Sequence, residues 1–351
     1  EEAREKVAKL IGAKPEEIIF TAGATESTNF IIKGYLDYRK YYGDGKNHVI
    51  TSRVEHKATL NTCRYLNGEL YSNNDPTISL FGEKKRVDRG FEASFVGVTS
   101  NGEISVEEIE KAIKENTALV SILYVNNEIG SISDVSRVSE ICKSHNIALH
   151  SDLTQALGKL EIDVKKLGID YASCSAHKIY GPKGIGAAYM KSDAYGIAPI
   201  TAFMHGGEQE FGYRAGTHAV HNIVGFGKAA EIALRDMKKN ETHIQKLDEL
   251  LLHGIANIDG IHTTVNESKR IPGIVSIVVE KEDFHNERFI KKISEEVALS
   301  TGSACSAGEP SYVLQALGLG DKVTKVLRVS INKFTTESDI NEFIKLLRAE
   351  I

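Results

Sequence analysis

Short apolar runs rich in β-forming residues alternate with segments of helical period along the first two-thirds of this chain. Continuous apolar strands that are separated by helices are typical of a mainly parallel sheet covered on both faces. The sequence therefore predicts an α/β fold that binds ligands in the loops at the carboxyl ends of its strands. The seven expected strands lie near residues 18–20, 48–51, 94–98, 119–125, 147–150, 171–174 and 186–190.

The pattern changes after a long helix that we expect from about Asn222 towards Lys239. We expect a large domain over residues 1–237 and a smaller α+β domain over residues 238–351, which is a common domain size. The smaller domain begins with a further helical stripe. After it we expect strands at 274–279, 297–300 and 327–331, and helices at 285–294 and 338–347.

Two stretches depart from this alternation. Residues 1–10 have the pattern of the middle of an amphipathic helix, with no methionine or N-cap, so we expect the natural N-terminus to lie upstream of Glu1. Residues 68–91 are polar, and a connection this long in a compact domain is usually a functional loop or a disordered insert. We favour a solvated surface loop, with a loop that docks a partner as the alternative.

Charge and cysteine content argue against several classes of protein. The 351 residues carry a formal net charge of −5, which does not suit a nucleic-acid or anionic-membrane surface. The four cysteines are far apart and form no CxxC pair, so they signal neither a zinc site nor a redox dithiol. His218 and His221 lack a carboxylate or cysteine at ligand spacing, and we expect no metal. Free thiols fit a reducing compartment. We expect the cytoplasm, or an organellar matrix if a transit peptide has been removed.

The segment SAHKIYGPKGIG, at Ser175–Gly186, places Lys178 after an expected apolar strand. Lysine is almost never fully buried without a partner or a function, and an uncharged amine in such a place can form a Schiff base. We expect this amine to lie deep between the two domains; the alternative is a surface turn punctuated by glycines. The glycines lead into a strand instead of opening a helix, which argues against a dinucleotide site.

Two other segments follow expected strands. HSDLTQ, at His150–Gln155, places Asp152 where a buried carboxylate must meet a cation, although a helix N-cap is the alternative. TAGATES, at Thr21–Ser27, forms a glycine turn between a strand and a helix, where backbone N–H groups can bind phosphate. Many α/β turns have this composition, so the segment carries weight only together with others.

Seven segments occur in the order found in cysteine desulfurases. They are TAGATES, VEHKA, VNNEIG, HSDLTQ, SAHKIYGPKGIG, GYRAGT and TGSACSAGEPSYVLQALG. The chain resembles, over nearly its whole length, the class-V, fold-type I pyridoxal-phosphate enzymes of the group that serves iron–sulfur cluster assembly. The resemblance implies a fold-type I large domain with a mainly parallel seven-stranded sheet, and a small domain that carries the loop around Cys305.

The resemblance also implies roles for residues at matching positions. Lys178 would form the Schiff base with pyridoxal 5'-phosphate, and Asp152 would pair with the ring nitrogen. His56 would stack on the ring and move protons. The other implied contacts are Gln155 to the phenolic oxygen; Ala24, Thr25, Ser175, His177 and, from the other subunit of a dimer, Thr217 to the phosphate; and Asn127 and Arg328 to the substrate carboxylate. The alternatives are ordinary turn residues at positions 56, 127 and 177, and a surface ion pair for Arg328.

Cys305 lies among small residues, unlike the other three cysteines, which we expect to be core residues. Only the thiolate form of cysteine is an effective nucleophile. The resemblance implies that L-cysteine becomes L-alanine while its sulfur moves to Cys305 as a persulfide, and then to an acceptor or scaffold protein. The alternative is a cysteine in a flexible surface loop.

Two other functions stay open from the sequence. One is a related pyridoxal-phosphate lyase or aminotransferase that acts on another small amino acid, such as selenocysteine. The other is a catalytically weak subunit that scaffolds the proteins of sulfur assembly. The destination of the sulfur is equally open among iron–sulfur clusters, tRNA thiolation and DNA phosphorothioation.

Overall fold

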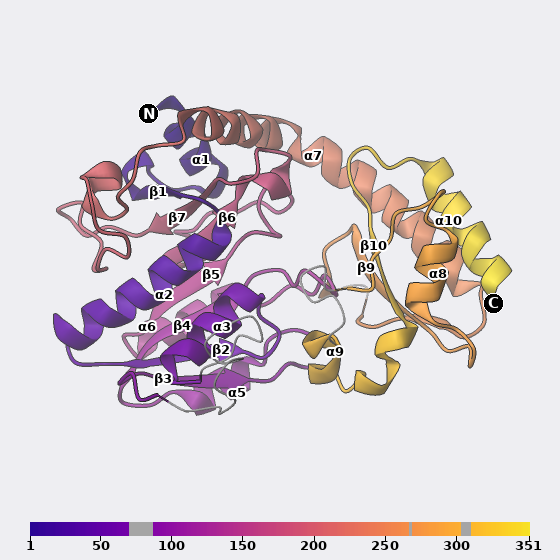
Figure 1. Ribbon diagram of the computed structural model, residues 1–351, viewed down its shortest axis with the longest axis horizontal. Coiled ribbons are helices and arrows are strands. Elements are labelled where there is room, and N and C mark those ends of the chain that lie inside the picture. Colours follow the sequence, from indigo (N-terminus) through magenta and orange to yellow (C-terminus); the bar gives the residue numbers. More distant parts are fainter. Residues whose placement is uncertain (70–86, 267–268, 303–309) are drawn as a thin grey trace, which may run out of the picture. The chain divides into compact units, whose positions relative to one another are not determined.

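A computed structural model describes residues 1–69, 87–266, 269–302 and 310–351. The chain divides into two compact units (Figure 1). The first unit comprises residues 1–97, 104–124 and 134–235, and the second comprises residues 98–103, 125–133 and 236–351. Most of the expected loop at 68–91, and Cys305 itself, fall outside the described residues.

A seven-stranded sheet forms the centre of the first unit, in the order β1-β7-β6-β5-β4-β2-β3. Four neighbouring pairs are parallel, and β7 is antiparallel to both β1 and β6. The predicted α/β class and mainly parallel sheet are therefore confirmed. The strands are β1 (Ile18–Thr21), β2 (His48–Ser52), β3 (Glu92–Val96), β4 (Thr117–Leu123), β5 (Ala148–Asp152), β6 (Tyr171–Ser175) and β7 (Gly186–Met190).

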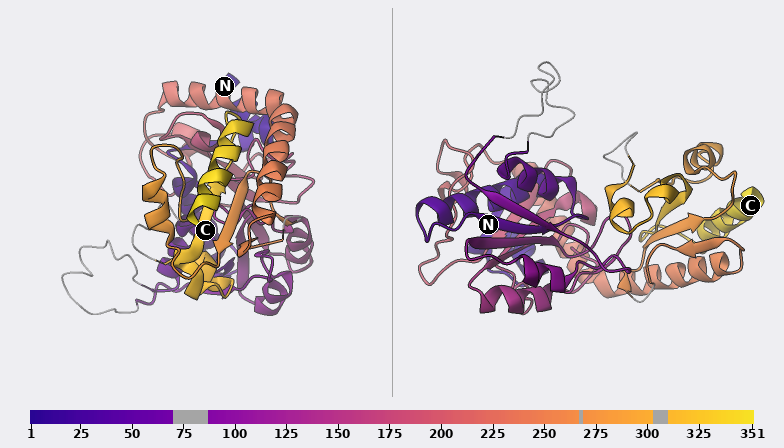
Figure 2. Two further views of the ribbon diagram at one scale, coloured as in Figure 1. Left: turned by 90° about the vertical axis from the view of Figure 1, so that its right-hand side faces the viewer. Right: turned by 90° about the horizontal axis from the view of Figure 1, so that it is seen from below.

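Helices cover both faces of this sheet (Figure 2). On one face, α2 (Ala24–Tyr41) and α3 (Lys57–Leu66) bury apolar side chains such as Phe30, Leu36 and Leu66 in a cluster with residues of β1, β2, β4, β6 and β7. On the other face, Phe226 of α7 (Val220–Ala256) packs edge-on against Phe20 at a ring separation of 6.4 Å. The other α-helices in the part of this unit that the structure describes are α1 (Glu2–Ile11), α5 (Val106–Ala112) and α6 (Val135–Ser144).

The second unit contains a three-stranded antiparallel sheet in the order β10-β9-β8. Its strands are β8 (Ile261–Thr263), β9 (Ile274–Val279) and β10 (Val326–Ser330). Apolar residues of β9 and β10 share one core with those of the helices, including Leu251, Phe289 and Phe343. The helices are the C-terminal part of α7, together with α8 (Asn286–Lys292), α9 (Tyr312–Ala316) and α10 (Glu337–Glu350).

Two expectations for the C-terminal part were wrong. The helix expected to end near Lys239 is one continuous helix, α7 (Val220–Ala256), because the polar residues around that position suit an exposed helical turn. The strand expected at 297–300 is reduced to a single bridge between Ser300 and Arg328. Val297 and Leu299 instead pack on the core from an irregular segment, so burial alone accounts for their apolar character. Among the described residues, no helix is long and apolar enough to cross a membrane.

Candidate active site

The ends of three adjacent strands align in register at one edge of the large sheet. Gly186, the first residue of β7, pairs with Thr21 at the end of β1 and with Ser175 at the end of β6. A Cβ atom at position 186 would lie 2.6 Å from the Cα of Gly23, so only glycine permits this close approach. Gly23 itself has φ 154° and ψ 175°, a region essentially limited to glycine. The turn that opens α2 is therefore held tightly against the sheet.

This turn presents the N-terminus of a helix of 18 residues. The first amides of a helix have no partner within it, and together with the helix dipole they form an anion site. Ala24 and Thr25 are the first two residues of α2, and the Oγ of Ser175 lies 3.6 Å from the position of a Cβ on Gly23. The Oγ of Ser175 also lies 2.9 Å from Nδ1 of His177. Four of the five residues that we assigned to the phosphate, Ala24, Thr25, Ser175 and His177, thus lie close together.

Asp152 is the last residue of β5 and is only 7% exposed. Its Oδ1 accepts a hydrogen bond of 2.9 Å from the Thr154 amide. One of the two carboxylate oxygens therefore has the capping role that we gave as the alternative. A buried carboxylate is costly unless cations or hydrogen-bond donors compensate it. The strands β2, β4, β5 and β6 are parallel, and Asp152 therefore lies at the same sheet edge as the turn that opens α2.

His56 is the N-cap residue of α3, which follows β2 at this edge. Its Nδ1 accepts a hydrogen bond of 3.1 Å from the Ala58 amide, and this caps the helix. Because Nδ1 is the acceptor, the proton of the neutral ring resides on Nε2. The preceding residue, Glu55, is fully buried and accepts a 2.6 Å hydrogen bond from Ser52. Burial raises the pKa of Glu55 to about 8, so an uncharged acid lies beside His56 at neutral pH.

Lys178 lies on a short 3-10 helix, Ala176–Ile179, that follows β6 at the same edge. The expectation that its side chain would be buried was wrong, because both Lys178 and His177 are exposed in this structure. The end of a strand predicts where in the fold the residue lies. It does not predict how buried the side chain is, because burial depends on which other segments pack there. Desolvation of the ring, and then the charges of Lys178 and Lys183, lower the pKa of His177. A neutral His177 suits hydrogen bonding in preference to ion pairing.

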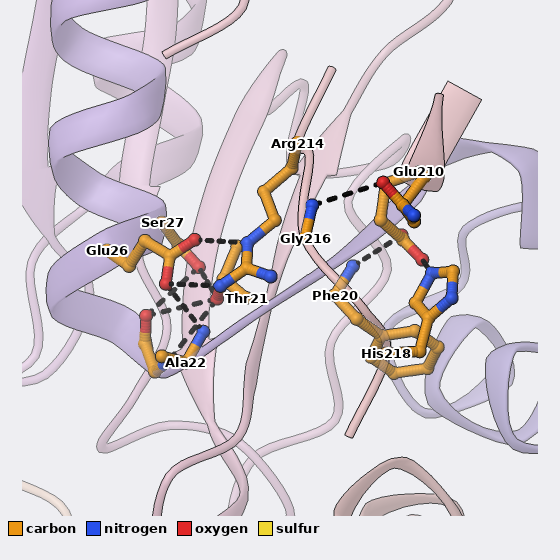
Figure 3. Close-up of polar contacts among 11 residues, drawn as sticks. Phe20, Thr21, Ala22, Glu26, Ser27, Glu210, Arg214, Gly216 and His218 are labelled. Atoms are coloured by element: carbon orange, nitrogen blue, oxygen red, sulfur yellow. Dashed lines mark hydrogen bonds and ion pairs between the residues drawn. The ribbon is translucent and has the colours of Figure 1, made fainter. Parts of the chain in front are cut away.

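Thr217 belongs to a segment that ion pairs of Glu26 and Glu210 hold against the sheet edge. Figure 3 shows these two carboxylates with Arg214 and His218. Arg214 forms two hydrogen bonds with Glu26 in the first turn of α2. Glu210 accepts hydrogen bonds from the Phe20 amide and from Arg4, and its Oε1 lies 2.6 Å from Nε2 of His218. Thr217 itself, between these anchors, is exposed.

Asn127 and Arg328 lie together in the second unit. Nη1 of Arg328 donates to the backbone oxygens of Asn127, at 3.0 Å, and Gly302, at 2.5 Å. The guanidinium is half-buried. The two carbonyl oxygens fix the orientation of the guanidinium plane. An arginine needs such a fixed orientation to bind a planar carboxylate through two hydrogen bonds. The two residues that we assigned to the substrate carboxylate are thus neighbours.

Sequence reasoning missed two sets of residues at this sheet edge. Lys159 donates a 3.0 Å hydrogen bond to Oε1 of Gln155, and the spacing of four residues could have revealed it. The pairing of Glu26 with Arg214 had no such signal, because 188 residues separate them.

The expected core role of three cysteines is confirmed: Cys63, Cys142 and Cys174 are buried free thiols.

A family model described as aminotransferase class-V matches residues 1–71 and 81–343. The chain belongs to the class-V aminotransferase family. This finding confirms the resemblance inferred from the ordered segments. The match spans both units and includes every residue to which we assigned a role.

Relatives and solved structures agree with the family. The "Cysteine desulfurase IscS" of Aeromonas salmonicida is 41% identical over 99% of this chain and 80% of its own length. A solved structure titled "NIFS-LIKE PROTEIN" superposes with a TM-score of 0.83 and 34% identity, over 99% of this chain and 86% of that chain. A third, titled "SspA in complex with cysteine", has a TM-score of 0.75 and 33% identity, over 95% of this chain and 87% of that chain.

Proposed function

We propose that this chain is a cysteine desulfurase that uses pyridoxal 5'-phosphate to convert L-cysteine into L-alanine and passes the sulfur onward. The observation that carries the proposal is the gathering of Lys178, Asp152, His56 and the N-terminus of α2 at one edge of the large sheet. Curated relatives that are named cysteine desulfurases support the same activity. Two of them are 41% and 42% identical to this chain in alignments that cover 99% of it.

The residues fit the cofactor in charge and in kind. The N-terminus of α2, with Thr25, Ser175 and His177, would hold the phosphate group. The buried carboxylate of Asp152 would face the protonated ring nitrogen, and Lys178 would hold the aldehyde. Bound in this way, pyridoxal phosphate supplies an electron sink for the charge left when an amino acid loses its α-proton.

The chain's own groups then have distinct tasks. The Lys178 amine takes the α-proton of the substrate, as a base within reach must. Nε2–H of His56 is the proton donor that its capped ring presents, because Nδ1 is occupied by the Ala58 amide. Arg328 and Asn127 hold the carboxylate, for which the guanidinium fork is a natural partner.

Cys305 is the proposed sulfur acceptor, and it lies outside the described residues. The other three cysteines are poor candidates for this role, because burial raises the pKa of the Cys142 and Cys174 thiols to about 12 and that of Cys63 further still. The Cys305 thiolate attacks the substrate sulfur. The S–S bond forms as the substrate's carbon–sulfur bond breaks, and the electron pair of that bond stays with the carbon that becomes the methyl group of alanine.

A homodimer completes the proposed site, with Thr217 contributed to the phosphate of the other subunit. Thr217 is exposed, and apolar side chains near it in the sequence are also exposed: Phe211 is 63%, Val220 64% and Val224 60% exposed. Apolar surface of this kind is frequent at interfaces between subunits. A sulfur-acceptor or scaffold protein of iron–sulfur assembly is the proposed second partner. A reducing compartment, the cytoplasm or an organellar matrix, suits the free cysteines.

The decisive experiment measures the visible absorbance of the purified protein and the alanine that it forms from cysteine. We expect the cofactor band to be lost in Lys178→Ala. In Cys305→Ser we expect the band to be kept while turnover is lost. A folded wild-type protein without bound cofactor would refute the proposal. Selenide release far exceeding sulfide release would favour a selenocysteine lyase, and a cofactor band without turnover would favour a scaffold subunit.

Subunit complementation tests the dimer. Lys178→Ala and Thr217→Glu each disable every site of their own homodimer, the second by placing a negative charge against the phosphate. A mixed dimer regains one intact site if Thr217 acts across the interface. We therefore expect activity to appear when the two inactive variants are unfolded and refolded together. No recovery in a sample shown to contain mixed dimers would place Thr217 in the same subunit as Lys178.

A further inference from the structure

Lys159 is a second lysine beside the candidate active site to which no role has been assigned. It is half-buried and lies in a helical turn after β5, in which the Leu157 amide donates to the Leu153 carbonyl at 2.8 Å. Its Nζ donates a hydrogen bond of 3.0 Å to Oε1 of Gln155, one helical turn earlier. Lys159 is thus attached to the side chain that is expected to contact the phenolic oxygen of the cofactor.

The turn that carries Lys159 packs closely on the helix that carries Lys178. Gly158 has a left-handed φ of 67°, and a Cβ at this position would lie 2.9 Å from Cγ2 of Ile179. Only glycine allows both this conformation and this contact. The positive charge of Lys178 also acts on Lys159. Burial first, and then this charge, lower the pKa of Lys159 to about 8.

The hydrogen bond to Lys159 determines which way the Gln155 amide points. A lysine ammonium has three donors and no acceptor, so the amide group must turn its oxygen towards it. The amide nitrogen, with its two N–H donors, then faces the opposite way. A glutamine without this partner could present its oxygen instead, which would repel a negatively charged phenolic oxygen.

We propose that Lys159 is a positioning residue: it holds the Gln155 amide with its N–H donors towards the phenolic oxygen of the cofactor, and adds a positive charge beside Lys178. The inference rests on the proposed use of pyridoxal phosphate. Coulomb repulsion between the two lysines is mutual, so Lys159 also favours the uncharged amine that Lys178 needs to react.

The test is a double-mutant cycle between Lys159→Met and Gln155→Ala, read out as affinity for pyridoxal phosphate and as the spectrum of the bound cofactor. We expect Lys159→Met to weaken the affinity roughly threefold to tenfold, the range for one impaired hydrogen bond. We also expect the pH at which the spectrum changes to rise, by about half a unit, because a nearby positive charge is lost. In the Gln155→Ala background, Lys159→Met should have little further effect on affinity.

Two further variants sharpen the test. Lys159→Arg keeps the donor and the charge, and should retain most of the affinity and the wild-type spectrum. Lys165→Met, at an exposed lysine of the same unit, is the matched control and should change neither property. If Lys159→Met does not fold, Lys159→Gln takes its place with the same expected changes. A wild-type protein that binds no cofactor would defeat the proposed function. Bound cofactor with identical affinity and spectrum in wild type and Lys159→Met would overturn this inference alone.

Discussion

Arg214 and Glu26 form a two-pronged ion pair, with Nε to Oε1 at 2.7 Å and Nη2 to Oε2 at 3.1 Å (Figure 3). The pair joins the GYRAGT segment, at Gly212–Thr217, to the first turn of α2. Glu26 also accepts a 2.8 Å hydrogen bond from the Ala22 amide, and so it fixes the turn that opens the helix. One carboxylate therefore joins the turn that is expected to bind the phosphate of this subunit to the segment whose Thr217 is expected to reach the phosphate of the other subunit.

Replacing either partner should loosen the phosphate site. We expect Arg214→Lys and Glu26→Gln each to lower the affinity for pyridoxal phosphate by about threefold to tenfold, because a bidentate, half-buried ion pair loses one of its contacts. Titration of the apoenzyme with the cofactor measures the effect. Arg137→Lys is the control, since Arg137 lies 3.6 Å from Glu107 and both side chains are exposed. Unchanged affinity in both variants would mean that the ion pair serves folding alone.

Breaking the buried pair of Arg4 and Glu210 should reduce stability more than binding. Both residues are less than a tenth exposed, and Arg4 donates to both carboxylate oxygens at 2.8 and 2.9 Å. Glu210→Gln leaves a buried guanidinium without its counter-charge, which costs about 3–5 kcal/mol of unfolding free energy. Urea denaturation of the apoenzyme measures this loss. A change below about 0.5 kcal/mol, the size typical of surface substitutions, would contradict it.

Much of the first unit could be predicted from sequence, because its strands are apolar throughout and its helices lie between them. All seven strands occur near the expected positions, and the segments with site residues follow the strand ends as predicted. The antiparallel direction of β7 is also intelligible afterwards. Only ten residues separate it from β6, which is too short for the usual crossover between parallel strands.

The remaining features depend on contacts that a local pattern does not contain. The pairing of Arg214 with Glu26 spans 188 residues. Residues 125–133, which include Asn127, belong to the second unit although the chain around them belongs to the first. Lys178 lies at the predicted strand end, but its side chain is exposed. A sequence pattern locates a residue along the chain and does not show which distant segments pack over its side chain.

Two buried histidines should make the fold sensitive to mild acid. His150 lies between the hydroxyl groups of Ser121 and Ser173, and His48 between those of Thr117 and Ser94. Burial lowers the pKa of His150 to about 3 and that of His48 to about 4. In the unfolded chain both rings take up a proton near pH 6.5. The folded state is therefore favoured above that pH and loses stability as the pH falls towards 4.

The expected loss is about 2 kcal/mol per histidine at pH 5. Unfolding free energies from urea titrations at pH 7, 6 and 5 measure it. His150→Asn removes one titrating group, so its stability should fall less steeply with acid than that of the wild type. His253→Gln, at an exposed position, is the control. Equal slopes for wild type and His150→Asn would refute the assignment.

Arg328 should determine how tightly the carboxylate of the substrate is held. Its Nη1 is fixed by the carbonyls of Asn127 and Gly302, and a guanidinium has further donors arranged as a fork. Lysine offers a single charged point in place of the fork. We expect Arg328→Lys to raise the KM for cysteine about tenfold or more, the cost of one impaired charge-assisted hydrogen bond, while the affinity for the cofactor stays unchanged.

Cysteamine, which is cysteine without the carboxylate, distinguishes a lost carboxylate contact from a general loss of activity. The wild type should prefer cysteine strongly, and Arg328→Lys should lose much of that preference because only the carboxylate contact has changed. Arg348→Lys, at an exposed site on α10, should keep it. An undiminished preference in Arg328→Lys would show that the carboxylate is bound elsewhere.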